Sequence, residues 1–364
     1  MPDVVVVGAG PAGIAAAKRC TEYGLDTLIL EKRTLPRDKV CSGMIMGPVA
    51  HTLIKQEFGY IPDNVLNQPN HLIGYTFHVP GVGNQKFDSF TPLTWRRNLD
   101  YWMSQQAKAK DATILPAARV IGFIPKKHRL IVEFEKEGKR DKIETRFLIG
   151  ADGTNSTVRK LLYPDLNTYY TQVYQECHQG ELDLDKKYFH WFFPLEIDGG
   201  FAVHQKDGLI VVDFGSNIGM MKQVVDWSKN FLYQNYNFNF RQRPVWCGGC
   251  LDLLLWQGLF SHTFLPAKGN VLLVGDASGI RLPVSGEGIG TALKSGLLAA
   301  DSIISAIKSG VPPDGHYLDG IEPILTEFRK MVPQFKRIND EKKSGGASLP
   351  IVLAEAYRET LRSF

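Results

Sequence analysis

The sequence predicts an α/β protein in which a Rossmann-like domain carries an inserted antiparallel-sheet domain and is followed by a C-terminal helical segment. Three observations predict this fold. A strand–helix–strand unit with a glycine-rich turn opens the chain, and two further apolar strands, at residues 147–150 and 271–274, end in turns that contain Gly and Asp. The stretches between them alternate aromatic and β-branched residues with polar ones, as antiparallel strands do.

Composition excludes several classes of protein. With 44% apolar and 22% charged residues, the 364-residue chain is neither disordered nor fibrous, and a net charge of +4 is too small to indicate nucleic-acid binding. Five cysteines without dense spacing do not predict a disulfide framework, so we expect a reducing, cytoplasmic environment. We expect no signal peptide, and every apolar stretch is interrupted before the roughly 18 residues of a membrane span. Peripheral contact with a membrane remains open, as does the oligomeric state.

The first thirty residues predict the strand–helix–strand unit. Val4–Val7 is a β-branched run typical of a strand buried on both faces of a parallel sheet. Residues 11–23 are rich in Ala, Ile and Lys, and Gly24 follows them as a helix-ending glycine. Thr27–Leu30 is a second apolar strand, so the chain begins as one half of a nucleotide-binding fold.

The turn inside this unit carries a complete G-x-G-x-x-G pattern. Gly8 permits the tight turn, Gly10 leaves room for a pyrophosphate, and Gly13 allows close packing of helix on sheet. Glu31, at the end of the second strand, is expected to accept hydrogen bonds from a ribose. The same ligand is expected to contact the flanking residues Pro11, Ala12 and Lys32. This unit predicts an ADP-containing cofactor but does not distinguish NAD from FAD.

Two later motifs favour a flavin. The apolar strand at residues 147–150 leads into Asp152 and Gly153, and the strand at residues 271–274 leads into Gly275 and Asp276. A carboxylate at such a strand end can bind a ribityl hydroxyl. The segment P-V-S-G-E-G-I-G then opens a helix expected from about Thr291 to Ile307, where backbone amides and the helix dipole can approach a flavin ring. From this segment we assign to the cofactor Pro283, Gly286, Gly288 and Ile289.

The order of these motifs resembles the FAD-dependent oxidoreductases of the para-hydroxybenzoate-hydroxylase fold, and most of all the geranylgeranyl reductase family, over about residues 3–310. The resemblance implies FAD as the cofactor and is less specific for the substrate. It also implies a discontinuous FAD-binding domain, an inserted substrate domain and a C-terminal helical segment. Their expected ranges are 1–70, 94–165 and 265–310 for the first, 71–93 and 166–264 for the second, and 311–364 for the third.

Two further segments support the reductase branch of this fold. Residues 39–43, K-V-C-S-G, resemble the K-x-C-G-G loop beside the flavin, with Ser42 in place of the first glycine and Cys41 at the reactive face. Residues 96–100 resemble the R-x-x-F-D helix start, so Arg96 is expected at the FAD pyrophosphate and Arg97 in solvent. Val120 is also expected at the cofactor.

Residues 188–194, Y-F-H-W-F-F-P, resemble the family's Y-x-W-x-F-P stretch, which places Tyr188 and Trp191 at the substrate. Phe189 and Phe193 break the W-x-W-x-I-P pattern of flavin-dependent halogenases. Because the run alternates as a strand does, its aromatic residues could instead belong to the core. We predict that the aromatic residues of the inserted domain, Phe201 and Phe214 among them, line an apolar pocket over the flavin.

These motifs predict an FAD-dependent oxidoreductase that reduces C=C bonds of an isoprenoid or other apolar substrate, with NAD(P)H or a small electron-carrier protein as donor. Two alternatives remain: an FAD monooxygenase acting on an aromatic or polyketide-like substrate, and a flavin-binding redox module without turnover. Candidate proton donors are Cys41, Tyr188 and His190. No metal site is expected, because the pair Cys247 and Cys250 has no second C-x-x-C; it is either redox-active or structural.

Overall fold

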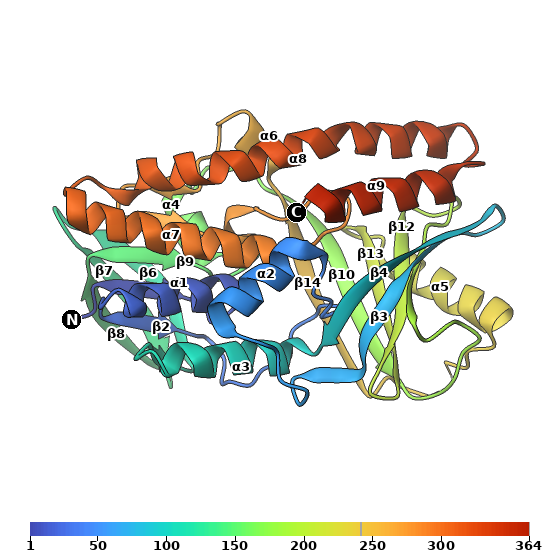
Figure 1. Cartoon of the computed structure of the whole chain (residues 1–364), viewed down its shortest axis with the longest axis horizontal. Coiled ribbons are helices and arrows are strands. Elements are labelled where there is room, and N and C mark those ends of the chain that lie inside the picture. The colour runs from blue at the N-terminus through green and yellow to red at the C-terminus, as the bar shows by residue number, and fades with distance from the viewer. Residues whose placement is uncertain (241, 364) are drawn as a thin grey trace.

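The structure is a computed structural model that describes residues 1–240 and 242–363. Within these residues a six-stranded, a seven-stranded and a three-stranded sheet are surrounded by helices (Figure 1). The six-stranded and three-stranded sheets occupy the end of the molecule that holds the N-terminus, and the seven-stranded sheet occupies the other end.

The six-stranded sheet is the Rossmann-like part of the fold. Its strands, in the order in which they lie side by side, are β15 (Ala267–Lys268), β16 (Val271–Leu273), β9 (Phe147–Gly150), β1 (Val4–Val7), β2 (Thr27–Leu30) and β5 (Thr113–Leu115). All pairings are parallel except β15 with β16, and β1 is buried along its whole length, as its β-branched run predicts. The carboxyl ends of β1, β9 and β16 therefore meet at one edge of the sheet.

Helices pack around this sheet and against one another. They are α1 (Pro11–Glu22), α2 (Gly47–Phe58), α3 (Arg96–Lys108), α4 (Thr157–Leu162), α6 (Trp256–Phe260), the 3-10 helix η1 (Gly275–Ser278) and α7 (Ile289–Ser309). Helix α7 crosses α1 closely, because a Cβ on Gly296 would lie 2.2 Å from the carbonyl oxygen of Ala12. The predicted helices at residues 11–23 and 291–307 are thus confirmed, and their contact brings the last cofactor motif beside the first.

The three-stranded sheet consists of β6 (Ala118–Pro125), β7 (Leu130–Lys136) and β8 (Lys139–Thr145). The basic residues Lys126–Arg129 lie in the tight turn between β6 and β7.

The seven-stranded sheet forms the inserted part of the fold. Its strands, in spatial order, are β14 (Trp246–Leu254), β10 (Tyr169–His178), β13 (Leu209–Asn217), β12 (Gly199–Lys206), β11 (Tyr188–Phe192), β3 (Leu66–Val79) and β4 (Gly83–Thr94). Every pairing is antiparallel except that of β3 with β11. The domain boundaries remain a prediction, and β3 runs across the one expected at residue 71.

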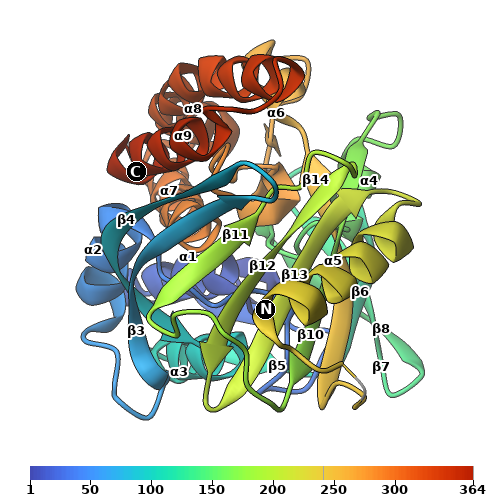
Figure 2. The ribbon, with the colours of Figure 1, turned by 90° about the vertical axis from the view of Figure 1, so that its right-hand side faces the viewer.

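The two faces of this sheet meet different neighbours. Helix α5 (Met221–Tyr236) lies across one face (Figure 2), where Phe192, Phe201 and Phe214 form a buried core. The C-terminal helices α8 (Pro313–Lys343) and α9 (Leu349–Ser363) lie on the other side. There Tyr357 of α9 packs 5.0 Å from the ring of Tyr75. No helix in the described part of the chain is long and apolar enough to span a membrane.

Candidate active site

A cavity of about 1260 Å³ lies between the carboxyl edge of the six-stranded sheet and the α9-side face of the seven-stranded sheet. It is larger than the roughly 300–1,000 Å³ of a pocket for one drug-sized ligand, so it has room for a dinucleotide and a second molecule. Most of the predicted cofactor residues line it: Gly8, Gly10, Pro11, Ala12, Glu31, Lys32, Cys41, Ser42, Arg96, Val120, Asp152, Gly153, Gly275, Asp276, Gly286, Gly288 and Ile289. Two others, Gly13 and Pro283, do not.

The three glycines of the first motif have different surroundings. Gly8 has a φ of +105°, and a Cβ there would lie 2.4 Å from the carbonyl oxygen of Ala151. A Cβ on Gly13 would lie 2.1 Å from the oxygen of Gly8, so this glycine allows the close packing of helix on sheet. A Cβ on Gly10 would meet no protein atom within 4 Å. Gly10 therefore keeps open a space that a pyrophosphate can fill.

Glu31 is held at the end of β2 by backbone amides. Its buried carboxylate accepts hydrogen bonds from the N–H of Ala9 at 2.8 Å and from the N–H of Arg33 at 3.0 Å. These bonds connect Glu31 to the glycine turn. Its carboxylate oxygens can still accept further hydrogen bonds from a ribose diol.

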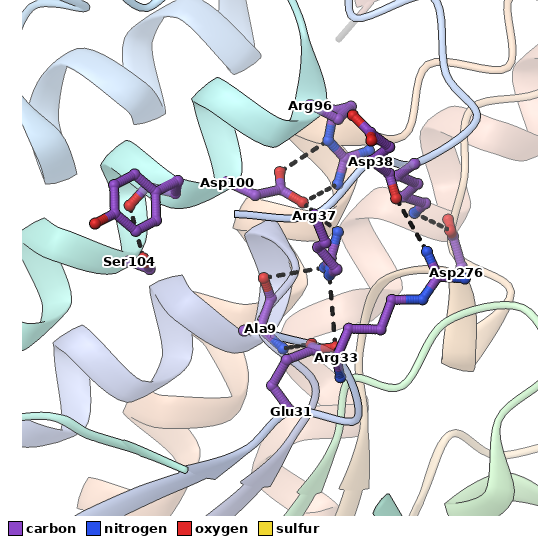
Figure 3. A network of polar contacts seen from close by, with 11 residues as sticks. Ala9, Glu31, Arg33, Arg37, Asp38, Arg96, Asp100, Ser104 and Asp276 are labelled. Atoms are coloured by element: carbon purple, nitrogen blue, oxygen red, sulfur yellow. Dashed lines mark hydrogen bonds and ion pairs between the residues drawn. The ribbon is translucent and has the colours of Figure 1, made fainter. Parts of the chain in front are cut away.

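Two arginines flank the glycine turn (Figure 3). Arg96 donates to Asp100 through Nε at 2.8 Å and through Nη2 at 3.0 Å, and Arg37 Nη1 donates to the same carboxylate at 3.1 Å. Burial opposes ionisation of Asp100, but Arg96 and Arg37 outweigh it and lower the pKa of this carboxyl. Both guanidinium groups line the cavity, where they can bind phosphate oxygens. Arg37 belongs to no motif, and the sequence analysis missed it.

The two aspartates at strand ends differ in their partners. The Asp152 carboxylate accepts from Ser156 Oγ at 2.5 Å and from the N–H groups of Thr157 at 2.6 Å and Val158 at 3.2 Å. The Asp152 carboxylate thus caps the start of α4, and both of its oxygens accept hydrogen bonds from this turn of the chain. Asp276 in η1 faces Lys39, whose Nζ lies 3.4 Å from Oδ2. Burial opposes its ionisation, but Lys39 and other nearby cations lower the pKa of Asp276.

We expect Asp276→Ala to weaken FAD binding by roughly 1–3 kcal/mol, because a charged acceptor is lost and Lys39 loses its partner. Equilibrium titration of the apoprotein with FAD measures this change. The control is Asp301→Ala, since Asp301 pairs with Arg19 on the partly exposed surface of α7. An Asp276→Ala protein with unchanged FAD affinity would contradict the assignment.

The segment before α7 is shaped by Glu287. Its buried carboxylate accepts from the N–H of Gly290 at 2.6 Å, and burial raises the pKa of Glu287 to about 7 although these amide bonds lower it. This internal cap fixes the start of the helix, so that Gly286 and Gly288 turn toward the cavity while Pro283 lies behind them.

The loop at residues 39–43 is anchored at Gly43. Its carbonyl oxygen accepts from the N–H of Thr94 at 3.0 Å, and its φ is +73°. A Cβ on Gly43 would lie 1.8 Å from the oxygen of Thr94, whereas the preceding position, Ser42, lines open cavity. This contact explains why the second glycine of the motif is present while the first is replaced, and it holds Cys41 on the cavity wall.

Strand alternation divides the aromatic run of β11 between two faces. Phe189 and Trp191 line the cavity. Tyr188 does not: its hydroxyl donates to Asp88 at 2.7 Å. His190 also faces the other way and bonds to His78 at 3.0 Å. The structure therefore does not bring Tyr188 or His190 to the reaction space, because odd and even residues of a strand point oppositely.

The expected pocket wall is smaller than the sequence suggested. Phe201 and Phe214 were predicted to line it, and this prediction is wrong, since both are buried in the core beneath α5.

Cys247 and Cys250 lie on the edge strand β14. Both are free, exposed and among the residues that line the cavity, so they are not buried structural thiols. The structure also brings to the cavity three charged residues that sequence reasoning did not find: Asp213, Asp252 and Arg281. In the described ranges no group of His, Cys, Asp and Glu could hold a metal ion.

These residues fit FAD. Gly10 leaves the space for a pyrophosphate, Arg37 and Arg96 supply cations beside it, and Glu31 and Asp276 supply acceptors on either side. The start of α7 supplies backbone amides where a flavin ring would lie.

Comparison with known proteins agrees with this interpretation. Residues 1–175 match the family described as FAD binding domain. A digeranylgeranylglycerophospholipid reductase of Methanosphaera stadtmanae is 26% identical over 84% of this chain and 78% of its own length. A menaquinone reductase of Mycobacterium tuberculosis is 26% identical over 83% of this chain and 76% of its own length.

Among solved structures, a geranylgeranyl bacteriochlorophyll reductase-like protein of Thermoplasma acidophilum has a TM-score of 0.72 and 17% identity, over 99% of this chain and 95% of that one. Flavin-dependent halogenases and aromatic hydroxylases share the fold, so the fold alone does not assign the reaction. Residues 1–175 thus match an FAD binding domain, and over more than four fifths of its length the chain is similar to FAD-domain relatives named as reductases.

Proposed function

We propose that this protein reduces C=C bonds in the isoprenoid chain of a lipid or quinone, with FAD as the redox cofactor. The single observation that carries the proposal is one continuous cavity that joins the dinucleotide site to an aromatic wall formed by Phe189 and Trp191. The sequence relatives named as reductases of isoprenoid compounds support the same reaction.

The cavity suits an extended apolar substrate. Trp191 packs 5.0 Å from the ring of Phe189, and both stand on a sheet whose neighbouring residues, Tyr75 and Phe77, are aromatic as well. Such a wall binds hydrocarbon through buried area and has few polar groups to satisfy. Helix α9 packs on this face of the sheet through Tyr357, whose ring lies 5.0 Å from that of Tyr75 and 5.2 Å from that of Phe77.

Bound FAD would supply the hydride, and the protein supplies orientation and charge. Arg37 and Arg96 would hold its phosphates, and Asp276 and the start of α7 would contact the rest of the cofactor. The loop that carries Cys41 lines the same cavity. The electron donor that reduces the oxidised FAD again is either NAD(P)H or a small electron-carrier protein.

We expect Cys41→Ser to retain FAD but to lower the rate of substrate reduction by up to about 100-fold, because small displacements of a reaction cavity wall cost rate. Rapid mixing of reduced protein with substrate measures this rate. The control is Cys20→Ser, a change in a buried thiol of α1 that should alter only stability. A Cys41→Ser protein with wild-type rate constants would remove this residue from the reaction.

The proposal is tested by incubating purified protein with dithionite and, separately, geranylgeranyl diphosphate, menaquinone and a digeranylgeranyl phospholipid. Mass spectrometry should find products two hydrogens heavier for each reduced bond with at least one of them. If all three substrates are recovered unchanged, the proposed function is wrong.

A further inference from the structure

A row of residues on the cavity side of the seven-stranded sheet changes from aromatic to polar. The pairing register places Trp191 of β11 beside Ala202, Ala202 beside Asp213, Asp213 beside Gln175, and Gln175 beside Gly248. Because residues paired in register share a face, the side chains of Trp191, Ala202, Asp213 and Gln175 point to the same side as the Cα hydrogen face of Gly248. Asp213 thus stands where the aromatic wall ends, and it lines the cavity with a side chain that is 15% exposed.

The Asp213 carboxyl is held at one oxygen only. Oδ1 accepts a hydrogen bond from Gln175 Nε2 at 2.5 Å. Oδ2 is buried and has no hydrogen-bond partner among the described residues. Nδ1 of His204 lies 3.6 Å from Oδ2, and both ring nitrogens of His204 are buried without partners in the same part of the chain. A buried carboxyl with one free oxygen is costly unless it serves a ligand or carries a proton.

The charged and titratable groups around Asp213 come from three elements: Lys206 and His204 of β12, Cys177 of β10, and Cys41 of the loop. Lys206 is buried, donates to the carbonyl oxygen of Thr94 at 3.2 Å, and lies 4.0 Å over the ring of Trp95. Lys206 therefore tethers this polar group to the strand end that also anchors the Cys41 loop.

Protonation of this cluster is set chiefly by burial. Burial raises the pKa of Asp213 to about 6, although Gln175 and Lys206 act in the opposite direction. Burial also lowers the pKa of Lys206 to about 8 and the pKa of His204 well below its usual value. His204 is therefore neutral at pH 7, and both forms of Asp213 are accessible near neutrality.

Reduction of a C=C bond requires a proton as well as a hydride. The hydride carries both electrons to one carbon, so the other carbon must receive a proton from an acid. Tyr188 and His190, two of the predicted donors, lie on the opposite face of the sheet. Asp213 lies on the cavity face beside the aromatic wall, where the substrate chain would lie.

We propose that Asp213 is the acid that protonates the substrate carbon, and that Gln175 and His204 position its carboxyl group. In this step the O–H bond of Asp213 breaks and a C–H bond forms, while the hydride and its electron pair come from reduced FAD. The carboxylate that remains regains a proton from water. This inference rests on the proposed function, since it assigns a role within that reaction.

The test compares Asp213→Asn with the wild-type protein, because the amide keeps the shape and the bond from Gln175 but has no acidic proton. Each protein is reduced anaerobically and mixed with whichever isoprenoid the wild type reduces, over about pH 5–9. The wild-type rate should fall as pH rises above about 6, because the acid is then ionised. Asp213→Asn should be at least about 100-fold slower and lack this decline, with substrate-induced flavin spectral shifts unchanged.

Three further proteins make the result specific. Asp213→Glu keeps an acid at this position and should regain part of the rate of substrate reduction. If Asp213→Asn retains no FAD, the rate and pH profile of Asp213→Glu are compared with those of the wild type instead. Cys41→Ser should keep the decline with pH, because its acid is intact. Asp88→Asn is the matched control, since Asp88 is exposed and bonds Tyr188 away from the cavity; it should behave as wild type.

A second readout does not depend on turnover. Infrared difference spectra between acid and neutral pH should contain, beside the carboxylic acid band of Glu287, a second component that is missing in Asp213→Asn. Wild-type rate and pH dependence in Asp213→Asn would overturn the assignment of the acid while leaving the proposed function intact. If the wild type itself reduces no isoprenoid, the proposed function fails and this role fails with it, even where the infrared band is present.

Discussion

Gly10→Asp is expected to abolish FAD retention while the protein remains folded. A Cβ at this position would meet no protein atom within 4 Å, so the backbone around Gly10 has room for the substitution. It would place a methylene group and a negative charge in the space reserved for a pyrophosphate, with both steric overlap and like-charge repulsion. Absorbance of the purified protein measures bound FAD, and circular dichroism measures the fold.

Two variants separate this effect from damage to the fold. Gly315→Asp introduces the same side chain near the start of α8, where a Cβ also meets nothing within 4 Å, and should retain full FAD. Gly13→Ala should instead lower stability, because its Cβ would lie 2.1 Å from the oxygen of Gly8. Full FAD occupancy in Gly10→Asp would show that the first glycine motif does not hold the cofactor.

Trp191→Ala is expected to weaken binding of long isoprenoid substrates by more than about tenfold, since a large aromatic surface leaves the cavity wall. Titration of the oxidised protein with substrate, followed by the flavin spectral shift, measures the affinity. The half-buried indole contacts Phe189 and Phe193 on one side and open cavity on the other, so its loss widens the pocket.

The neighbouring residue provides the control. Phe192 points to the opposite face, fully buried and stacked 4.5 Å from the ring of Phe201. Phe192→Ala should lower the free energy of unfolding by about 3–5 kcal/mol and leave substrate affinity unchanged in the folded fraction. If Trp191→Ala melts much lower yet binds substrate normally, Trp191 belongs to the core, and the aromatic wall does not select the substrate.

The parts of this site that could be predicted from sequence are those fixed by local geometry. A strand that ends in glycines and opens a helix constrains its own backbone, so Gly8, Gly10 and Asp276 could be placed within a few residues of chain. Gly43 differs, because its motif placed it in the sequence but the contact that demands a glycine there is made with the distant residue Thr94.

The parts that sequence analysis missed depend on contacts between distant segments. Arg37 gains its role only because Asp100, on a helix far along the chain, lies beside it. Asp213 is one polar residue in an apolar strand, and nothing in its neighbours shows that β12 and β10 place His204 and Gln175 around it. Alternation showed that the β11 aromatics divide between two faces, but not which face meets the cavity.

We expect reduced FAD in this protein to pass hydride to a C=C bond without oxygen, and one anaerobic experiment decides this. The reduced protein is mixed with the isoprenoid substrate while flavin absorbance is followed, and the mass of the product is then determined by mass spectrometry. The flavin should reoxidise completely in the absence of oxygen, with a product two hydrogens heavier. A flavin that stays reduced until oxygen is admitted, with a product one oxygen atom heavier, would contradict this expectation.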